Sequence, residues 1–179
     1  MGAIVEFVDP GFEDVTEVIE TLWYGGAANI VSKIEVPLRS ELDPGLLRVA
    51  EIGRKIGVVD YLRAVDRRNE LSQLMGAFFR KWDLLLSPAV AITAFEAGHD
   101  VPAGSDSETW FSWSPYCHPF NLTQQPAISI PFGKNHDGMP IGIQLAGPRF
   151  RDDLVLSVAD AILRNHQPAV LLEVLQPNS

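Results

Sequence analysis

The 179-residue sequence predicts an α/β fold in a single domain, residues 1–179. Three observations predict this class. Apolar residues recur at helical spacing over residues 59–82 and again over residues 151–166. Two nearly continuous apolar runs, Ala127–Phe132 and Ile141–Ala146, have the length and composition of strands. Runs without strict alternation are typical of interior strands, so we expect both to be covered on both faces, in part by helices of this chain and in part by residues that precede it.

The chain opens with the run AIVEFV, Ala3–Val8, which is rich in β-branched and aromatic residues. A Pro-Gly breaker follows it, so the run predicts a strand that begins almost at the first residue. Residues 11–24 have helical periodicity and predict a helix. Pro44–Ile56 predicts a second helix, with Asp43 as its N-cap and Pro44 at its first position.

The clearest predicted helix spans about residues 59–82. Its apolar face is formed by Leu71, Leu74, Met75, Phe78, Phe79 and Trp82. Arg68 lies on the continuation of this face, which favours a buried or snorkelling arginine paired with a carboxylate. The next residues, Asp83–Ser87, predict a short buried strand that Pro88 ends. Residues 97–109 are rich in Gly, Pro, Ser and Asp and predict a loop.

Turn and strand signals organise the rest of the chain. Asp137-Gly138 predicts a turn between the two apolar runs. Pro131 is expected to end its run or to mark a bulge, since proline cannot donate to a strand ladder. Arg151–His166 predicts a helix whose two N-terminal aspartates favour its start. The apolar tail that begins at Val170 predicts a last strand.

Composition excludes several classes of protein. The net charge of −9 argues against binding to a nucleic-acid backbone, which requires clustered basic residues. Arg63 and Arg67 therefore indicate a solvated helix face. The single cysteine excludes an intrachain disulfide and is typical of a reducing compartment. No run has the length of a membrane span, and the N-terminus lacks the basic region of a signal peptide. We expect a cytoplasmic protein with neither nucleic-acid nor membrane partners.

A search for catalytic groups finds no complete set. The sequence has neither a G-x-S-x-G elbow nor an S-x-x-K motif. Cys117 and His118 are adjacent, but neighbours on an extended chain point to opposite faces, so we interpret Cys117 as a small packed residue. The four histidines have no metal-ligand spacing, and no Gly-rich phosphate loop is present. We expect no metal and no cofactor.

Several segments together resemble one family. PFNLTQQPAISIPFG and DGMPIGIQLAGPRFRDDLVLSVADAI resemble the C-terminal region of amidase-signature hydrolases. DLLLSPAVA, SELDPGLLRVAEIG and VVDYLRAVDRRNEL are similar to segments of the same family. The resemblance runs in the family's order from Gly2 to about Asn165. It implies part of the mixed-sheet amidase-signature fold with flanking helices, incomplete in this chain.

The resemblance also implies a mechanism. In this family a serine is the nucleophile, and a second serine on a cis peptide relays a proton to a lysine base. The Gly/Ser-rich segment that carries these serines is not in this sequence, and none of its lysines matches the catalytic lysine: Lys33, Lys55, Lys81 and Lys134. We therefore expect a C-terminal portion of an amidase that begins in mid-domain, with no catalytic residue of its own and no activity alone.

What this portion supplies in the family is sheet scaffold and the wall of the acyl pocket. By position, the resemblance assigns Phe111, Ser114 and Cys117 to the substrate pocket. Relatives that act on charged tRNA carry an aspartate where this chain has Ser114, which disfavours that substrate. The aromatic residues of this segment predict an apolar or aromatic acyl group. The family often has a glycine where this chain has Gln124, so the turn there is expected to differ.

Three functional hypotheses follow. The chain is part of an amidase whose remainder is missing, or half of a split amidase that a partner completes, or a non-catalytic binding module on the same scaffold. The expected partners are a small-molecule amide in the complete enzyme and either the N-terminal amidase part or a second copy of the chain.

Overall fold

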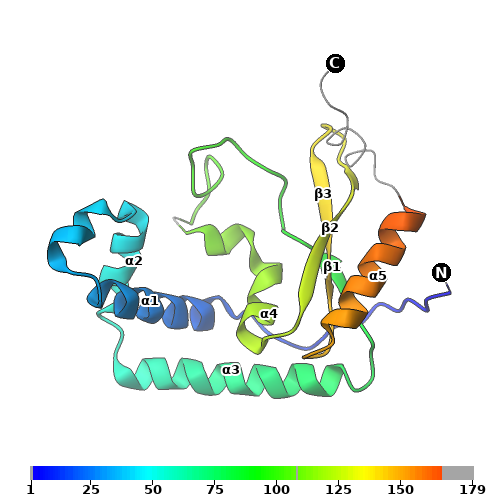
Figure 1. Ribbon diagram of the computed structural model, residues 1–179, viewed down its shortest axis with the longest axis horizontal. Helices are drawn as coiled ribbons and strands as arrows, with labels where there is room; N and C mark the ends of the chain where they lie inside the picture. The colour runs from blue at the N-terminus through cyan, green and yellow to red at the C-terminus, as the bar shows by residue number, and fades with distance from the viewer. Residues whose placement is uncertain (1, 108, 167–179) are drawn as a thin grey trace. The chain divides into compact units, whose positions relative to one another are not determined.

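A computed structural model describes residues 2–107 and 109–166 (Figure 1). The chain clusters into two compact units. We call residues 13–71 the helical unit, and residues 1–12 with 72–179 the sheet unit. The single domain expected from the sequence stays a prediction. The strand predicted in the tail from Val170 lies outside the described residues.

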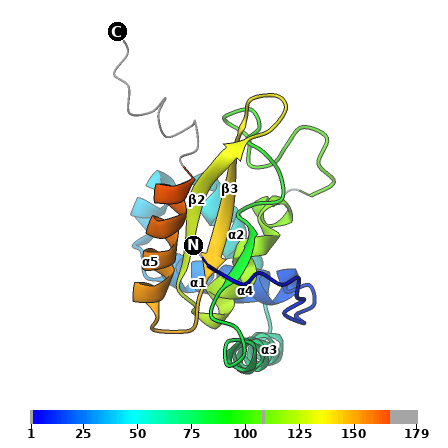
Figure 2. The same ribbon diagram turned by 90° about the vertical axis from the view of Figure 1, so that its right-hand side faces the viewer.

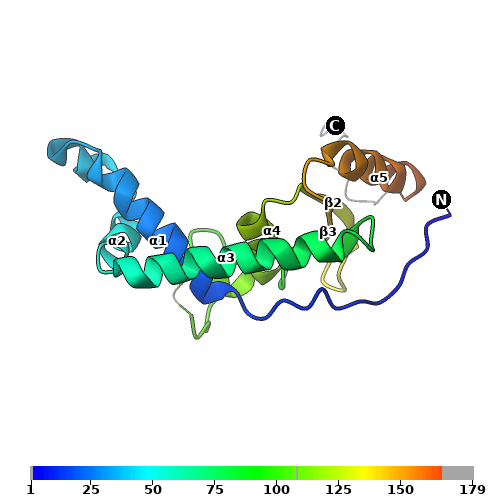
Figure 3. The same cartoon turned by 90° about the horizontal axis from the view of Figure 1, so that it is seen from below.

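The helical unit is built from α1 (Thr16–Ser32), a 3-10 helix (Val36–Glu41), α2 (Pro44–Gly53) and the first part of α3 (Val58–Phe78). The start of α2 is confirmed: the Asp43 carboxylate accepts a hydrogen bond from Leu46 N at 2.9 Å, and Pro44 lies in the first turn. α3 runs as one uninterrupted helix (Figure 3). It ends at Phe78, earlier than the predicted end at Trp82.

α1 both begins and ends later than predicted. It begins late because Asp14 Oδ1 accepts bonds from Thr16 N at 2.9 Å and from Thr16 Oγ1 at 2.7 Å, which closes a local turn that competes with the helix. It continues beyond Tyr24 because Ala27 and Val31 are buried against Ala50 of α2. This packing outweighs the weak helix propensity of the two glycines that follow Tyr24.

The sheet unit contains three antiparallel strands in the order β1-β3-β2. They are β1 (Leu85–Pro88), β2 (Ala127–Lys134) and β3 (Pro140–Ala146). The predicted strand pair and its turn are confirmed. Gly138 has φ +81°, and the Asn135 side chain accepts bonds from Asp137 N and Met139 N. The register shifts between Pro131 and Gly133, so Pro131 marks a bulge, as expected.

Different helices cover the two faces of the sheet (Figures 1 and 2). α5 (Asp152–Asn165) lies on one side and buries Val155 and Ala159 with Ile130 and Leu145. α4 (His118–Thr123) lies on the other side, where Phe120 and Ala146 join Met75 and Phe78. β3 is buried at Gln144, Leu145 and Ala146.

The described residues cover β2 on one face only, so the remainder of the expected cover stays a prediction. The exposure of β2 alternates along the strand, and Ala127, Ser129 and Phe132 face solvent. The reason is its position: β2 is the edge strand of the described sheet, and α5 covers only one of its faces.

The strand predicted at Ala3–Val8 is wrong. These residues carry no regular secondary structure, and Ile4 and Phe7 are 90% and 109% exposed. A β-prone run forms a strand only when a neighbouring strand satisfies its N–H and C=O groups. The described sheet pairs β1, β2 and β3 with one another and does not include this segment.

Residues 110–117, which we call the 110–117 segment, form the 3-10 helices Trp110–Trp113 and Pro115–Cys117 and lead into α4. Gln124 caps the C-terminal end of α4: it has φ 62° and donates from its N to Phe120 O at 2.8 Å. Gln124 thus adopts the left-handed conformation that costs least free energy for glycine, the residue that relatives often have at this position. Among the described residues, no helix combines the length and apolarity that a membrane crossing requires.

Candidate functional site

Phe111 lies at the centre of a buried aromatic cluster on the α4 side of the sheet. Its side chain is 1% exposed. The Trp110 ring stacks on it with a centroid distance of 4.0 Å, and the His118 ring meets it edge-on at 5.3 Å. The predicted pocket residue is therefore covered by neighbours from its own segment and from α4.

Ser114 faces the same cluster and is 6% exposed. Its Oγ lies 3.1 Å from Trp110 O, to which it can donate, and 3.2 Å from His118 Nε2. A serine beside a histidine is the beginning of a nucleophile–base pair. Here both side chains are buried and the serine bonds a backbone carbonyl, so the pair holds the 3-10 turn against α4.

Cys117 points elsewhere, toward the loop that follows β1. Its Sγ donates to Ala89 O at 3.4 Å, while His118 contacts Ser114, so the adjacent thiol and imidazole have different partners. Burial raises the pKa of the Cys117 thiol. The thiol is thus held protonated near neutral pH, which agrees with the prediction of a packed residue without nucleophilic character.

An open hollow of ≈ 420 Å³ lies beside the cluster. Trp113 lines it from the 110–117 segment, and the loop after β1 supplies the remaining lining: Val90, Ile92, Thr93, Ala94, Phe95, Glu96, Ala97 and His99. Phe95 meets Trp113 edge-on at 5.6 Å, and Trp113 Nε1 donates to Asp100 O at 2.9 Å. This lining is mostly apolar, and neither Phe111 nor Ser114 is part of it.

The structure thus adds residues to the three that the resemblance assigned to the pocket. Trp113, which lies between Phe111 and Ser114, faces the hollow, and the apolar residues of the 90–97 loop complete it. Their signal was Val90, Ile92 and Phe95, large apolar side chains in a stretch without strand or helix periodicity. His118 and Gln144 are buried polar residues of the same region, and the second interrupts the apolar run of β3.

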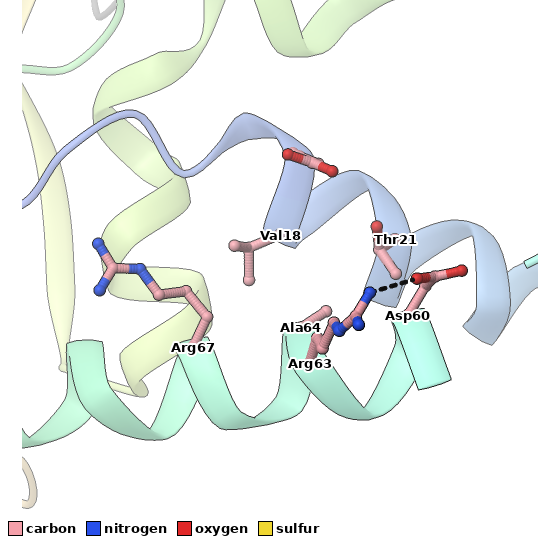
Figure 4. Close-up of a pocket in the computed structure, with 7 residues that line it drawn as sticks. Val18, Thr21, Asp60, Arg63, Ala64 and Arg67 are labelled. Atoms are coloured by element: carbon pink, nitrogen blue, oxygen red, sulfur yellow. Dashed lines mark hydrogen bonds and ion pairs between the residues drawn. The ribbon is translucent and has the colours of Figure 1, made fainter. Parts of the chain in front are cut away.

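A second hollow, of ≈ 290 Å³, lies within the helical unit (Figure 4). Arg63 Nη1 pairs with Asp60 at 3.3 Å across its rim, while Arg67 extends away from this pair. Arg67 bonds Glu13 and Glu70. These are exposed ion pairs of the solvated face that the sequence predicted, and such pairs contribute little free energy. Arg68 is half-buried.

Within residues 2–107 and 109–166, no group of three or more His, Cys, Asp or Glu side chains is placed to hold an ion.

Comparison with known proteins gives a consistent result. The sequence profile of the amidase family matches residues 26–156. An acylamidase of Rhodococcus erythropolis is 31% identical over 165 residues, which are 89% of this chain and 34% of that protein. A glutamyl-tRNA(Gln) amidotransferase polypeptide of Thermotoga maritima is 33% identical over 103 residues, 58% of this chain and 21% of that protein.

A solved amidase crystal structure superposes with a TM-score of 0.74 at 27% identity and covers 86% of this chain and 36% of the other. The chain therefore spans about a third or less of the length of these relatives. The matched residues include both strands of the predicted pair and the 110–117 segment. By this match the chain belongs to the amidase-signature family and carries part of its mixed-sheet fold.

Proposed function

We propose that this chain is the C-terminal portion of an enzyme that hydrolyses carboxamide C–N bonds, and that it supplies sheet scaffold and the wall of the acyl pocket. The observation that carries the proposal is the family match over residues 26–156, together with the apolar hollow beside the 110–117 segment. The acylamidase and amidotransferase names of the relatives agree with amide chemistry.

The pocket residues of the proposal are Phe111, Ser114 and Cys117, and Trp113 joins them. Phe111 and Ser114 are buried in the same segment as Trp113, which lines the hollow, and we infer that they set the volume available to an acyl group. The aromatic rings favour an apolar or aromatic acyl group over a charged one. Ser114 stands where tRNA-dependent relatives carry aspartate, so a small-molecule amide is favoured over a charged tRNA.

The nucleophile and base would come from outside this chain. The Ser-Ser-Lys set has no counterpart in the sequence, and Ser114 and Cys117 are held by backbone carbonyls. Pocket walls cannot replace a nucleophile, because the catalytic groups accelerate the chemical step by many orders of magnitude. The isolated chain would then be inactive, and a partner chain carrying the family's Gly/Ser-rich segment would complete the active site. We expect this to take place in the cytoplasm.

Co-expression with the N-terminal part of a close relative tests the proposal. We expect amide hydrolysis from the pair, none from either part alone, and none when the partner's signature serine is changed to alanine. Turnover by the purified single chain would contradict the assignment. A pair that binds amides without turning them over would favour the alternative, a non-catalytic binding module.

Within an active pair, Ser114→Thr tests the pocket. The added methyl group should lower kcat/KM for bulky acyl groups more than for small ones, since one methyl or methylene in such a pocket changes transition-state binding by about 1–3 kcal/mol. Cys117→Ser, a nearly isosteric change at another residue of the proposed pocket, should keep much of the activity for all acyl sizes. An equal loss of kcat/KM for all acyl sizes would contradict the assignment of Ser114 to the pocket.

A further inference from the structure

Gln144 is a buried polar residue in the central strand of the sheet. It is 6% exposed and lies within the otherwise apolar run of β3. Its neighbour Leu145 packs on the α5 side. Because successive side chains of a strand point to opposite faces, Gln144 points to the other side, toward the 110–117 segment. Ser87 of β1 and Ser129 of β2 are its partners in register.

The side-chain amide of Gln144 connects two parts of the sheet unit. Its Nε2 donates to Tyr116 O at 3.0 Å and to Ser87 Oγ at 3.3 Å. A primary amide has two N–H donors, so these two contacts use both. One bond stays within the sheet, and the other reaches the backbone of the 110–117 segment.

Two further bonds attach the same segment to the loop after β1. Trp113 O accepts from Ala91 N at 3.3 Å, and Cys117 Sγ donates to Ala89 O at 3.4 Å. Ala91 belongs to a loop that can move together with the segment, whereas Ala89 directly follows β1 and is tied to one side of β3, since its N donates to Gly142 O at 3.2 Å. Gln144 differs because its backbone is paired on both sides, with β1 and with β2, and is therefore fixed.

We propose that Gln144 is a positioning residue: it fixes the 110–117 segment on the sheet and so sets the shape of the acyl pocket. Its place in the pocket rests on the proposed function, whereas the attachment it provides does not. Loss of the bond to Tyr116 O should let the segment open locally while the sheet stays paired.

Cys117 reports this opening directly, because it is the chain's single cysteine, is half-buried, and follows Tyr116. The experiment measures the rate of thiol labelling by a disulfide reagent in Gln144→Leu and in the unchanged protein, without denaturant. A net hydrogen bond of ordinary strength corresponds to a population change of up to about tenfold, so we expect labelling to be faster by about that factor.

Two control variants separate attachment from general damage to the sheet. Ser129→Ala changes a register partner of Gln144 on β2 and should leave the rate unchanged. Ser87→Ala removes one acceptor but keeps the bond to Tyr116 O, so its effect on the labelling rate should be clearly smaller than that of Gln144→Leu. An effect of Ser87→Ala equal to that of Gln144→Leu would overturn the assignment.

Repeating the labelling at several urea concentrations distinguishes local from global opening. A local opening exposes little surface, so the extra rate should depend weakly on urea, unlike the unfolding midpoint measured by circular dichroism. A rate that follows global unfolding, or no change of rate, would refute the proposal. If Gln144→Leu does not fold, Gln144→Asn gives the same test, with a shortened amide that cannot reach both acceptors. None of these measurements depends on amidase activity.

Discussion

Gly53 is a position where adding a single methyl group should lower stability clearly. It is the last residue of α2 and lies against the backbone of α1, and a Cβ built on it would lie 1.9 Å from Tyr24 O. A carbon–oxygen contact needs roughly 3.3 Å, so Gly53→Ala would require the two helices to separate by about 1.4 Å.

The cost can be estimated from this geometry. Overpacking costs about 1–3 kcal/mol, and the upper part of that range applies here because the obstacle is backbone. The better helix propensity of alanine returns at most about 1 kcal/mol. We expect Gly53→Ala to lower the free energy of unfolding by about 2 kcal/mol, which lowers Tm by roughly 4–8 °C in a chain of this length.

Thermal and urea unfolding followed by circular dichroism measure the effect. The matched control is Gly26→Ala, in the interior of α1, where an added Cβ meets no atom within 4 Å. That variant should be neutral or more stable by up to about 1 kcal/mol. A neutral Gly53→Ala, or equal destabilisation by both changes, would show that the two helices do not approach each other this closely.

Three other predictions concern the sheet unit. Gln124→Gly should be more stable than Gln124→Ala by about 1 kcal/mol, because both lose the bond from Arg149 but only glycine relaxes at φ 62°; equal urea midpoints would argue against a left-handed turn. Because the folded chain holds the Cys117 proton more tightly than the unfolded chain, this thiol's contribution to stability should fall as pH rises from the ordinary cysteine pKa through the raised one; a Cys117→Ser variant with the same pH dependence would contradict this. The isolated chain should self-associate in light scattering, and Phe7→Glu should reduce this, because residues 4–8 expose a β-prone apolar run; a compact monomer that binds no hydrophobic dye would instead favour a binding module.

Sequence patterns predicted the elements whose causes are local. The Asp43-Pro44 start of α2, the turn at Gly138 and the bulge at Pro131 depend on side-chain capping, a positive φ and a missing N–H. Each of these causes acts within a few residues. The amphipathic α5 is similar, since its buried stripe can be read from its spacing alone.

Elements that depend on distant partners were predicted less well. α1 extends to Ser32 because α2 covers Ala27 and Val31. The two glycines that follow Tyr24 predict the end of a helix, and nothing in the local sequence indicates that α2 will cover the residues beyond them. The Ala3–Val8 run has the composition of a strand, but strand formation requires a second strand to pair with. In both cases local propensity was identified correctly, and the tertiary partner decided the outcome.

The candidate site shows the same division. The resemblance located the 110–117 segment, but not which of its side chains faces open space: Trp113 does, while Phe111 and Ser114 face α4. In 3-10 turns, side chains three residues apart share a side, as Phe111 and Ser114 do, while Trp113 points away from them; a segment this short has no periodicity from which that can be read.

The two faces of β3 differ in the side chains that they present, and this difference could be used to locate the candidate pocket from the sequence. Toward α5 the strand presents aliphatic side chains only, and these make an ordinary core. Toward the 110–117 segment it presents Gln144, at the level of Ser87 and Ser129 in the neighbouring strands. A polar residue in a buried run costs free energy unless it is hydrogen-bonded, so a partner for Gln144 had to lie on that side. An interruption of an apolar run is therefore informative about the opposite layer: it marks the face to which an irregular segment, and here the candidate pocket, is attached.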